Sequence, residues 1–127
     1  MELDHAGVVV DDVHAVADRY ETLLECETVH IEDLDDLRLL FLDLGNTYVE
    51  LIEPLAEGTI ADYLDSHGAG IHHLAFVTDD IEAAMANARD MGVELIDEEP
   101  RPGAWGHTVA FLDPSTTAGI LIEFVEH

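Results

Sequence analysis

Hydrophobic residues along this chain follow first a strand-like and then a helix-like spacing, and the same succession occurs twice. Residues 3–10 and 71–77 are apolar or alternating, and an Asp pair suited to capping a helix follows each of them. Apolar residues then recur at helical spacing through 13–24 and 81–92. This predicts two helices, the second ending near Gly92.

Each half closes with a pattern typical of a β-hairpin, with turn-forming residues between two apolar stretches, over 37–54 and 107–126. Between the halves, 57–70 has the pattern of a short helix ending in glycines. Each half therefore predicts the order β-α-β-β-β, and the fold class is α+β. We expect one domain over 1–127, with module one at about 1–56, a connecting helix at about 57–69 and module two at about 70–127.

The composition is strongly acidic, with 29 Asp and Glu residues against four basic ones, all of them arginine. A net charge near −25 argues against nucleic acid and anionic membranes as partners. At molar salt the Debye length falls to about 3 Å, which screens this self-repulsion. We therefore interpret the acidity as the surface of a halophilic protein, with an acidic docking surface for a cationic partner as the alternative.

Cysteine usage and hydropathy bear on the compartment. Cys26 is the only cysteine, so an internal disulfide is impossible, and we expect a buried side chain in a reducing cytoplasm. No apolar run is long enough to span a bilayer, and the N-terminal residues do not resemble a secretory signal.

Two adjacent histidines, His72 and His73, stand in the first strand of module two and should point to opposite faces. Aligning the halves pairs His73 with His5, and it pairs Glu50 with Glu123 on the last strands. If the modules pack about a pseudo-twofold axis, these four matched side chains converge on one centre. Two imidazoles and two carboxylates suit a divalent cation such as Co, Mn, Ni or Zn. Taken singly, each glutamate would be a solvated strand residue.

The repeat with its His-Glu-His-Glu set resembles the vicinal oxygen chelate (glyoxalase/bleomycin resistance/dioxygenase) superfamily over nearly the whole chain. Within it, the sequence is similar to the methylmalonyl-CoA epimerase family in the blocks FLDLGNTYVELIEPL, GTIADYLDSHGAGIHHLAF, VELIDEEPRPGAWG and GILIEFVE. The resemblance implies paired βαβββ half-barrels, usually in a homodimer, and an acyl-CoA substrate. It also implies a divalent cation bound by His5, Glu50, His73 and Glu123.

The reaction that the resemblance implies is the interconversion of (2R)- and (2S)-methylmalonyl-CoA through an enolate that the cation stabilises. One group removes the proton alpha to the thioester and another returns it on the opposite face. Lysine is absent, so we expect the matched carboxylates Glu50 and Glu123 to be the catalytic groups. The alternative is that they only bind the cation and an unidentified group acts as base.

The chain departs from the family pattern at Asp113 and Ser115, where His and Lys are usual, and this leaves the acyl group or thiol carrier open. A glyoxalase I-type isomerase shares the ligand set and is an alternative. A ring-cleaving dioxygenase would leave Glu50 unexplained. A non-enzymatic ligand-sequestering protein would have little reason to keep four ligands.

The remaining features are expected to be structural. Residues 101–106 should form at least a turn, with a loop that closes over substrate as the functional interpretation. We expect His30, His67 and His107 at the surface and a frayed His127 at the terminus.

Overall fold

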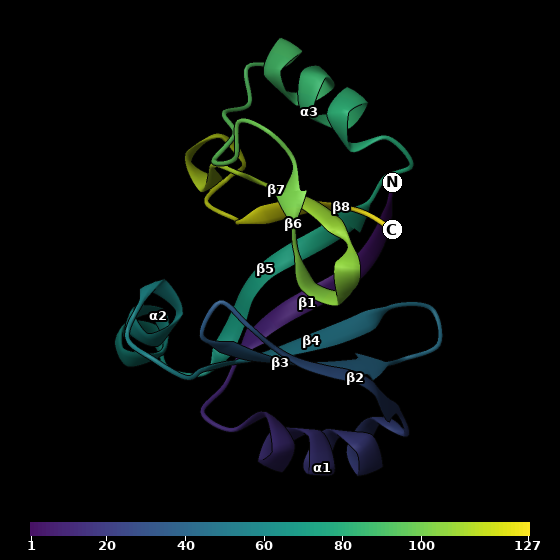
Figure 1. Ribbon diagram of the computed structural model, residues 1–127, viewed down its shortest axis with the longest axis vertical. Helices are drawn as coiled ribbons and strands as arrows, with labels where there is room; N and C mark the ends of the chain where they lie inside the picture. Colours follow the sequence, from purple (N-terminus) through teal and green to yellow (C-terminus); the bar gives the residue numbers. More distant parts are fainter. The chain divides into compact units, whose positions relative to one another are not determined.

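The computed structural model describes residues 1–127, and the chain forms two compact units (Figure 1). The first unit is His5–His72, and the second unit is Met1–Asp4 together with His73–His127. None of the helices has both the length and the apolar character needed to cross a membrane. The elements in chain order are β1 (Glu2–Val9), α1 (Val13–Leu24), β2 (Glu27–Leu34), β3 (Leu37–Asp43), β4 (Tyr48–Pro54), α2 (Thr59–His67), β5 (Gly70–Val77), α3 (Ile81–Asp90), β6 (Arg101–Pro102), η1 (Ala104–Gly106), β7 (Thr108–Leu112), η2 (Pro114–Thr116) and β8 (Ile122–Glu126).

In the first unit, four strands lie in the order β2-β3-β4-β1, with β1 parallel to β4 and the other neighbours antiparallel. Helix α1 covers one face of this sheet (Figure 1). Val13 and Ala17 of the helix are buried in one apolar cluster with the strand residues Leu40, Leu42 and Leu51. Since side chains alternate along each strand, the intervening residues point away from α1 and form the opposite face.

The second unit repeats this arrangement with the order β5-β8-β7-β6, in which β5 runs parallel to β8. Helix α3 covers one face (Figure 1), where Met85 and Ala88 join an apolar cluster with Ala110, Leu112 and Phe124. The face away from α3 carries a smaller buried cluster of Ala75, Val109 and Val125.

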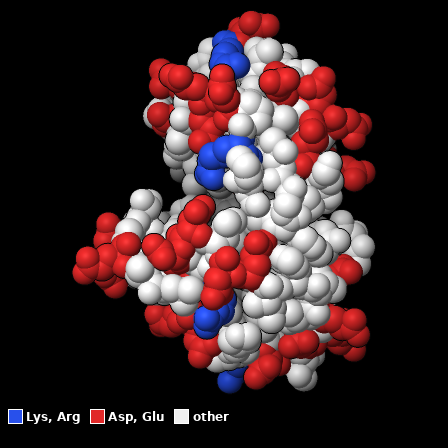
Figure 2. Space-filling model, viewed as in Figure 1, with Lys and Arg blue, Asp and Glu red and all other residues white.

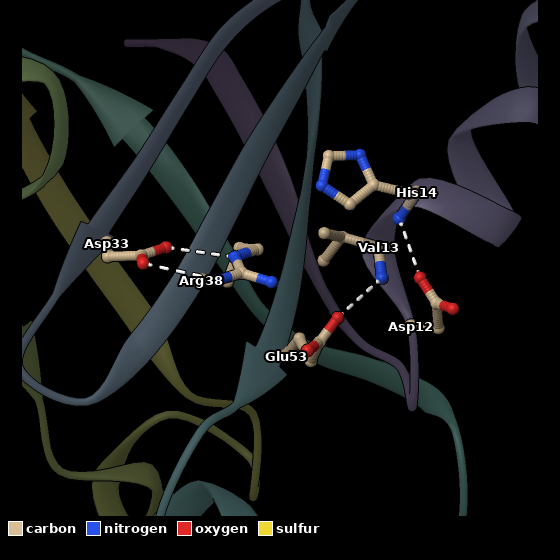
Figure 3. A network of polar contacts seen from close by, with 6 residues as sticks. All are labelled: Asp12, Val13, His14, Asp33, Arg38 and Glu53. Atoms are coloured by element: carbon tan, nitrogen blue, oxygen red, sulfur yellow. Dashed lines mark hydrogen bonds and ion pairs between the residues drawn. The ribbon is translucent and has the colours of Figure 1, made fainter.

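At the N-terminus of each main helix, two carboxylates at equivalent positions of the repeat accept hydrogen bonds from backbone N–H groups. Asp12 caps α1 by accepting hydrogen bonds from the backbone N–H groups of His14 and Ala15, and Glu53 of β4 accepts one from Val13 at 2.9 Å (Figure 3). In the second unit, Asp80 caps α3 by accepting from Ala83, and Glu126 of β8 accepts from Ile81 at 2.9 Å. The last strand of each repeat is thus tied to its own helix by a glutamate.

The predicted α+β class and the two β-α-β-β-β modules are confirmed, and the fold is glyoxalase-like. The helix predicted at 13–24 has those bounds, whereas the second main helix ends at Asp90 and the connecting helix spans Thr59–His67. Residues 101–106 do contain the predicted turn, but Arg101–Pro102 also form the short strand β6. Trp105 in this turn has a positive φ of 60°.

Acidic side chains far outnumber basic ones on the face that Figure 2 shows. Red Asp and Glu side chains are spread over this face, and blue Arg side chains are few and scattered, since the chain has 29 acidic residues and four arginines. Some of these charges pair, as Arg38 does with Asp33 at 3.0 Å (Figure 3), and this lowers the pKa of the Asp33 carboxyl. Such exposed pairs contribute little to stability.

Candidate metal centre

The first unit buries a histidine and a glutamate together on the sheet face that points away from α1. His5 comes from β1 and Glu50 from the neighbouring β4, with His5 Nε2 3.3 Å from Glu50 Oε1. Both residues are only 5% exposed. The Phe41 ring contacts the imidazole of His5 edge-on, with the ring centroids 5.6 Å apart.

The second unit contains an equivalent pair on the face that points away from α3. His73 of β5 lies beside Glu123 of β8, with 3.4 Å between Nε2 and Oε1, and the two residues are 4% and 6% exposed. Phe111 contacts the imidazole of His73 edge-on at 5.5 Å. Each unit thus presents a buried His–Glu pair with a phenylalanine at its side.

The neighbouring His72 behaves as the alternation along a strand requires. It is half-buried on the other face of β5, and its ring contacts that of Tyr63 of α2 edge-on, with the centroids 5.0 Å apart. Tyr63 in turn donates a hydrogen bond from its hydroxyl to the carbonyl of Ile71. His72 therefore packs against α2, and of the two histidines only His73 faces Glu123.

The donor atoms of the two pairs suit a divalent cation. Histidine nitrogen and carboxylate oxygen are the ligands that Co, Mn, Ni and Zn accept together. Each pair offers one nitrogen and one oxygen donor, and a positive ion at a pair would lessen the cost of burying its carboxylate.

A second His–Glu pair lies on the same face of the first unit, and the sequence did not reveal it. His30 Nε2 is 3.1 Å from Glu32 Oε1, and both side chains are 27% exposed. His30 is therefore not the plain surface residue that was expected. Its ring lies against Phe41 with the centroids 6.1 Å apart, so a single phenylalanine separates His30 from His5.

The second unit has a different polar pair beside its phenylalanine. The guanidinium carbon of Arg101 lies over the Phe111 ring, 5.5 Å from the centroid, and its Nε donates to Asp97 Oδ1 at 3.0 Å. The other oxygen of Asp97 accepts a hydrogen bond from the backbone N–H of Phe111. The positively charged guanidinium of Arg101 thus lies next to Phe111, the aromatic neighbour of His73.

The C-terminal residue is held in place, so the prediction of a frayed His127 is wrong. Its Nε2 lies 2.6 Å from Oδ1 of the buried Asp4, and its ring stacks on that of His107 with the centroids 4.0 Å apart. Trp105 stacks on the other histidine, His107, at 5.8 Å. This stack fixes the turn after β6 against the end of β8.

Two other residues singled out from the sequence have structural roles. Cys26 is 8% exposed, and burial, followed by the charges of Glu21 and Asp43, raises the pKa of its thiol, so it is a buried apolar residue as predicted. Asp113 accepts a hydrogen bond from the backbone N–H of Ser115, which lowers the pKa of the Asp113 carboxyl. Asp113 therefore caps the turn η2 as a carboxylate.

Comparisons with known proteins agree with this architecture. Residues 4–111 match the model of the glyoxalase/bleomycin resistance protein/dioxygenase superfamily. The ethylmalonyl-CoA/methylmalonyl-CoA epimerase of Cereibacter sphaeroides is 36% identical over 126 residues, which cover 95% of this chain and 94% of that protein.

Solved structures of methylmalonyl-CoA epimerases also superpose closely. The Mycobacterium tuberculosis enzyme is 34% identical with a TM-score of 0.93, and the match covers 98% of this chain and 86% of that one. A Streptomyces coelicolor methylmalonyl-CoA epimerase variant in complex with 2-nitronate-propionyl-CoA is 33% identical with a TM-score of 0.92, covering 99% and 96% of the two chains. The chain belongs to the glyoxalase/bleomycin resistance protein/dioxygenase superfamily, in which these similar proteins are methylmalonyl-CoA epimerases.

Proposed function

We propose that this protein interconverts (2R)- and (2S)-methylmalonyl-CoA and that it uses a divalent cation bound by His5, Glu50, His73 and Glu123. The observation that carries the proposal is the buried His–Glu pair at equivalent positions of both repeats. The relatives named as epimerases supply the substrate class, and the Streptomyces enzyme with 2-nitronate-propionyl-CoA is an example that binds an acyl-CoA. One cation held by both pairs requires that the modules form one domain, as the sequence predicts.

The chemistry needs a stabilised enolate, since the proton alpha to a thioester leaves reluctantly. A bound divalent cation supplies Lewis-acid stabilisation of the enolate charge, and its native identity among Co, Mn, Ni and Zn is open. The phenylalanine beside each pair, Phe41 or Phe111, shields the ligands from water, which strengthens the electrostatic interactions inside the site. Only interactions that grow toward the enolate accelerate the reaction.

Proton transfer requires one group on each face of the enolate. From the sequence, Glu50 and Glu123 are the candidates for both roles, as ligands and as catalytic groups. We propose that Glu123 transfers the proton on one face of the enolate, and that Glu50 acts mainly as a ligand of the cation.

An acyl-CoA is strongly anionic, and this acidic protein has few cations with which to attract it. Arg101 is well placed because its guanidinium lies beside the aromatic neighbour of His73. Asp113 and Ser115, which stand where the family usually has His and Lys, offer no positive charge. We propose that Arg101 supplies part of the missing attraction.

The test is the exchange of the C2 hydrogen of methylmalonyl-CoA for deuterium, measured by NMR in molar salt. We expect exchange and epimerisation that a chelator abolishes and that added Co²⁺ or Mn²⁺ restores. Metal analysis of the untreated protein should find one cation per chain. Absence of exchange, with turnover of the hemithioacetal of methylglyoxal and glutathione instead, would replace this proposal by a glyoxalase I-type reaction.

We further propose a salt-adapted cytoplasmic homodimer. The single cysteine fits a reducing compartment, and the edge strands of a β-rich chain favour pairing with a second copy. Light scattering at micromolar concentration in high salt should give twice the mass of the 13.9 kDa chain. A monomer under these conditions would contradict the dimer.

A further inference from the structure

We propose that His30 is the proton-transfer group on the side of the first unit, and that Glu32 positions its imidazole. This inference rests on the proposed epimerisation and deepens it. The sequence left open whether a residue other than the two glutamates acts as base, and this inference names that residue.

The strand register brings His30 to the face that holds the His5–Glu50 pair. Glu50 of β4 lies opposite Phe41 of β3, and Phe41 lies opposite His30 of β2, so the three residues form one row across the sheet. Neighbouring strands are about 4.8 Å apart, which places the backbone of His30 about 10 Å from that of Glu50. Our proposal requires that a substrate bound at the His5–Glu50 pair has its reacting carbon over Phe41, between Glu50 and His30.

A β-bulge is responsible for this placement. Thr28 lies opposite Leu42, which is buried under α1, and the register then shifts so that His30 lies opposite Phe41. In a regular ladder Val29 would lie opposite Phe41 and His30 opposite Leu40, on the face that α1 covers. Bulges next to active sites re-aim side chains in this way, at the cost of a disrupted strand ladder.

The surroundings of His30 suit a proton-transfer group. Its side chain is 27% exposed, so a ligand can reach it, and the Phe41 ring shelters one side of it. In our assignment Nε2–H of His30 donates to the Glu32 carboxylate, which only accepts, and Nδ1 exchanges the proton. An imidazole can both accept and donate a proton, as a general base or acid must. A neighbouring carboxylate fixes the tautomer and stabilises the imidazolium.

The second unit shows that this pair is not a general feature of the repeat. Beside Phe111, the equivalent of Phe41, stands the Arg101–Asp97 pair. A guanidinium stays protonated at neutral pH and cannot exchange the proton. Proton transfer in the second unit therefore stays with Glu123, as in the proposed function, and we assign the imidazole to the first unit alone.

The proposed step involves no oxidant and no co-reactant. His30 Nδ1 takes the C2 proton as the C–H bond breaks, and the electron pair of that bond moves into the enolate. The second proton-transfer group, assigned to Glu123 in the proposed function, returns a proton to C2 on the opposite face, and the enolate electron pair forms the new C–H bond. Exchange with water then resets the imidazolium and the carboxylate, and the reverse reaction uses the same two groups in exchanged roles.

The decisive experiment compares the two epimers of methylmalonyl-CoA in D₂O with His30→Gln. Each epimer presents its proton to one group, so loss of His30 should slow C2 exchange of one epimer by at least about a hundredfold. Exchange of the other epimer should continue with retained configuration, because Glu123 still removes and returns its proton. Metal content should be unchanged, and His14→Gln, which alters an exposed histidine of α1, should behave as the wild type on both epimers.

Glu32 is tested by rescue. Glu32→Ala should lower the turnover number for the same single epimer without changing KM, and Glu32→Gln, whose amide oxygen can still accept from Nε2–H, should recover much of the loss. These variants keep His30 itself, so they report on the role even if His30→Gln folds poorly.

The outcomes separate this inference from the function on which it rests. Wild-type protein that exchanges neither epimer overturns the proposed function and this inference with it. Wild-type exchange that survives in His30→Gln for both epimers overturns the inference alone. Equal loss for both epimers with the metal retained also overturns it, because a one-sided proton-transfer group cannot produce that result.

Discussion

The carboxylate of Glu53 ties β4 to the start of α1, and its removal should destabilise the protein measurably. Its Oε1 accepts the backbone N–H of Val13 at 2.9 Å in a partly buried position (Figure 3). A hydrogen bond to a charged group contributes about 1.5–3 kcal/mol, and a carboxylate at a helix N-terminus adds about 0.3–1 kcal/mol. Water can replace part of the lost bond at this partly buried site. We therefore expect Glu53→Ala to lower the free energy of unfolding by about 2 kcal/mol.

Matched variants sharpen this prediction. Glu126→Ala removes the equivalent bond to Ile81 and should cost a similar amount. Glu53→Gln keeps an acceptor without the charge and should cost about 1 kcal/mol. Glu57→Ala alters an exposed glutamate after β4 and should stay within about 0.5 kcal/mol of the wild type.

The assay is urea unfolding at one fixed molar salt concentration, followed by circular dichroism. A stability change should move the midpoint and leave the slope with urea unaltered. If Glu53→Ala unfolds at the same urea concentration as Glu57→Ala, the tie between β4 and α1 contributes nothing and the reasoning fails.

Four further predictions follow from the site and the surface. His73→Ala should lose the cation and the activity, whereas His72→Ala should keep both; the opposite result in metal analysis would show that the repeat was aligned wrongly. Because the pKa of the Cys26 thiol is raised, iodoacetamide should label native protein slowly at pH 8 and urea-unfolded protein at an ordinary rate, and equal rates would contradict burial. Arg101→Gln should raise KM for the acyl-CoA more than it lowers the turnover number, and an unchanged KM would remove this residue from substrate attraction. The melting temperature should fall below a few tenths molar salt as screening weakens, and a salt-independent value would count against halophilic adaptation.

The features that could be predicted from the sequence are those that strand and helix periodicity determine. The spacing of apolar residues predicted α1 at its observed bounds, and the matched strands paired His5 with His73 and Glu50 with Glu123. Alternation along β5 also separated His73 from His72 correctly, since one is buried and the other contacts Tyr63.

The features that the sequence did not reveal depend on a local break in strand alternation and on contacts between residues far apart in the chain. The bulge at Val29 moves His30 to the other face of the sheet, and no residue type there announces an extra position in the strand. His127 was expected to fray because it is terminal, yet its contacts with Asp4 and His107 join residues far apart in the chain. Such pairings become visible only when the fold is known.

The two modules are alike at their buried His–Glu pairs and differ beside the phenylalanines. The same strand positions supply a histidine and a glutamate in each unit, with Phe41 or Phe111 edge-on to the imidazole. Yet His30 with Glu32 stands beside Phe41, whereas Arg101 with Asp97 stands beside Phe111.

This difference bears on what kind of protein the chain is. A protein that only sequesters a ligand needs positive charge and apolar surface, and it gains nothing from an imidazole that a bulge brings to the face of the His5–Glu50 pair, beside a carboxylate. A catalyst that moves a proton needs a proton-transfer group on one side and a positive charge for an anionic substrate elsewhere. In our proposals the His30–Glu32 pair supplies the first and Arg101 the second. The broken symmetry of the repeat therefore favours an enzyme over a binding protein, on grounds independent of the similarity to known epimerases.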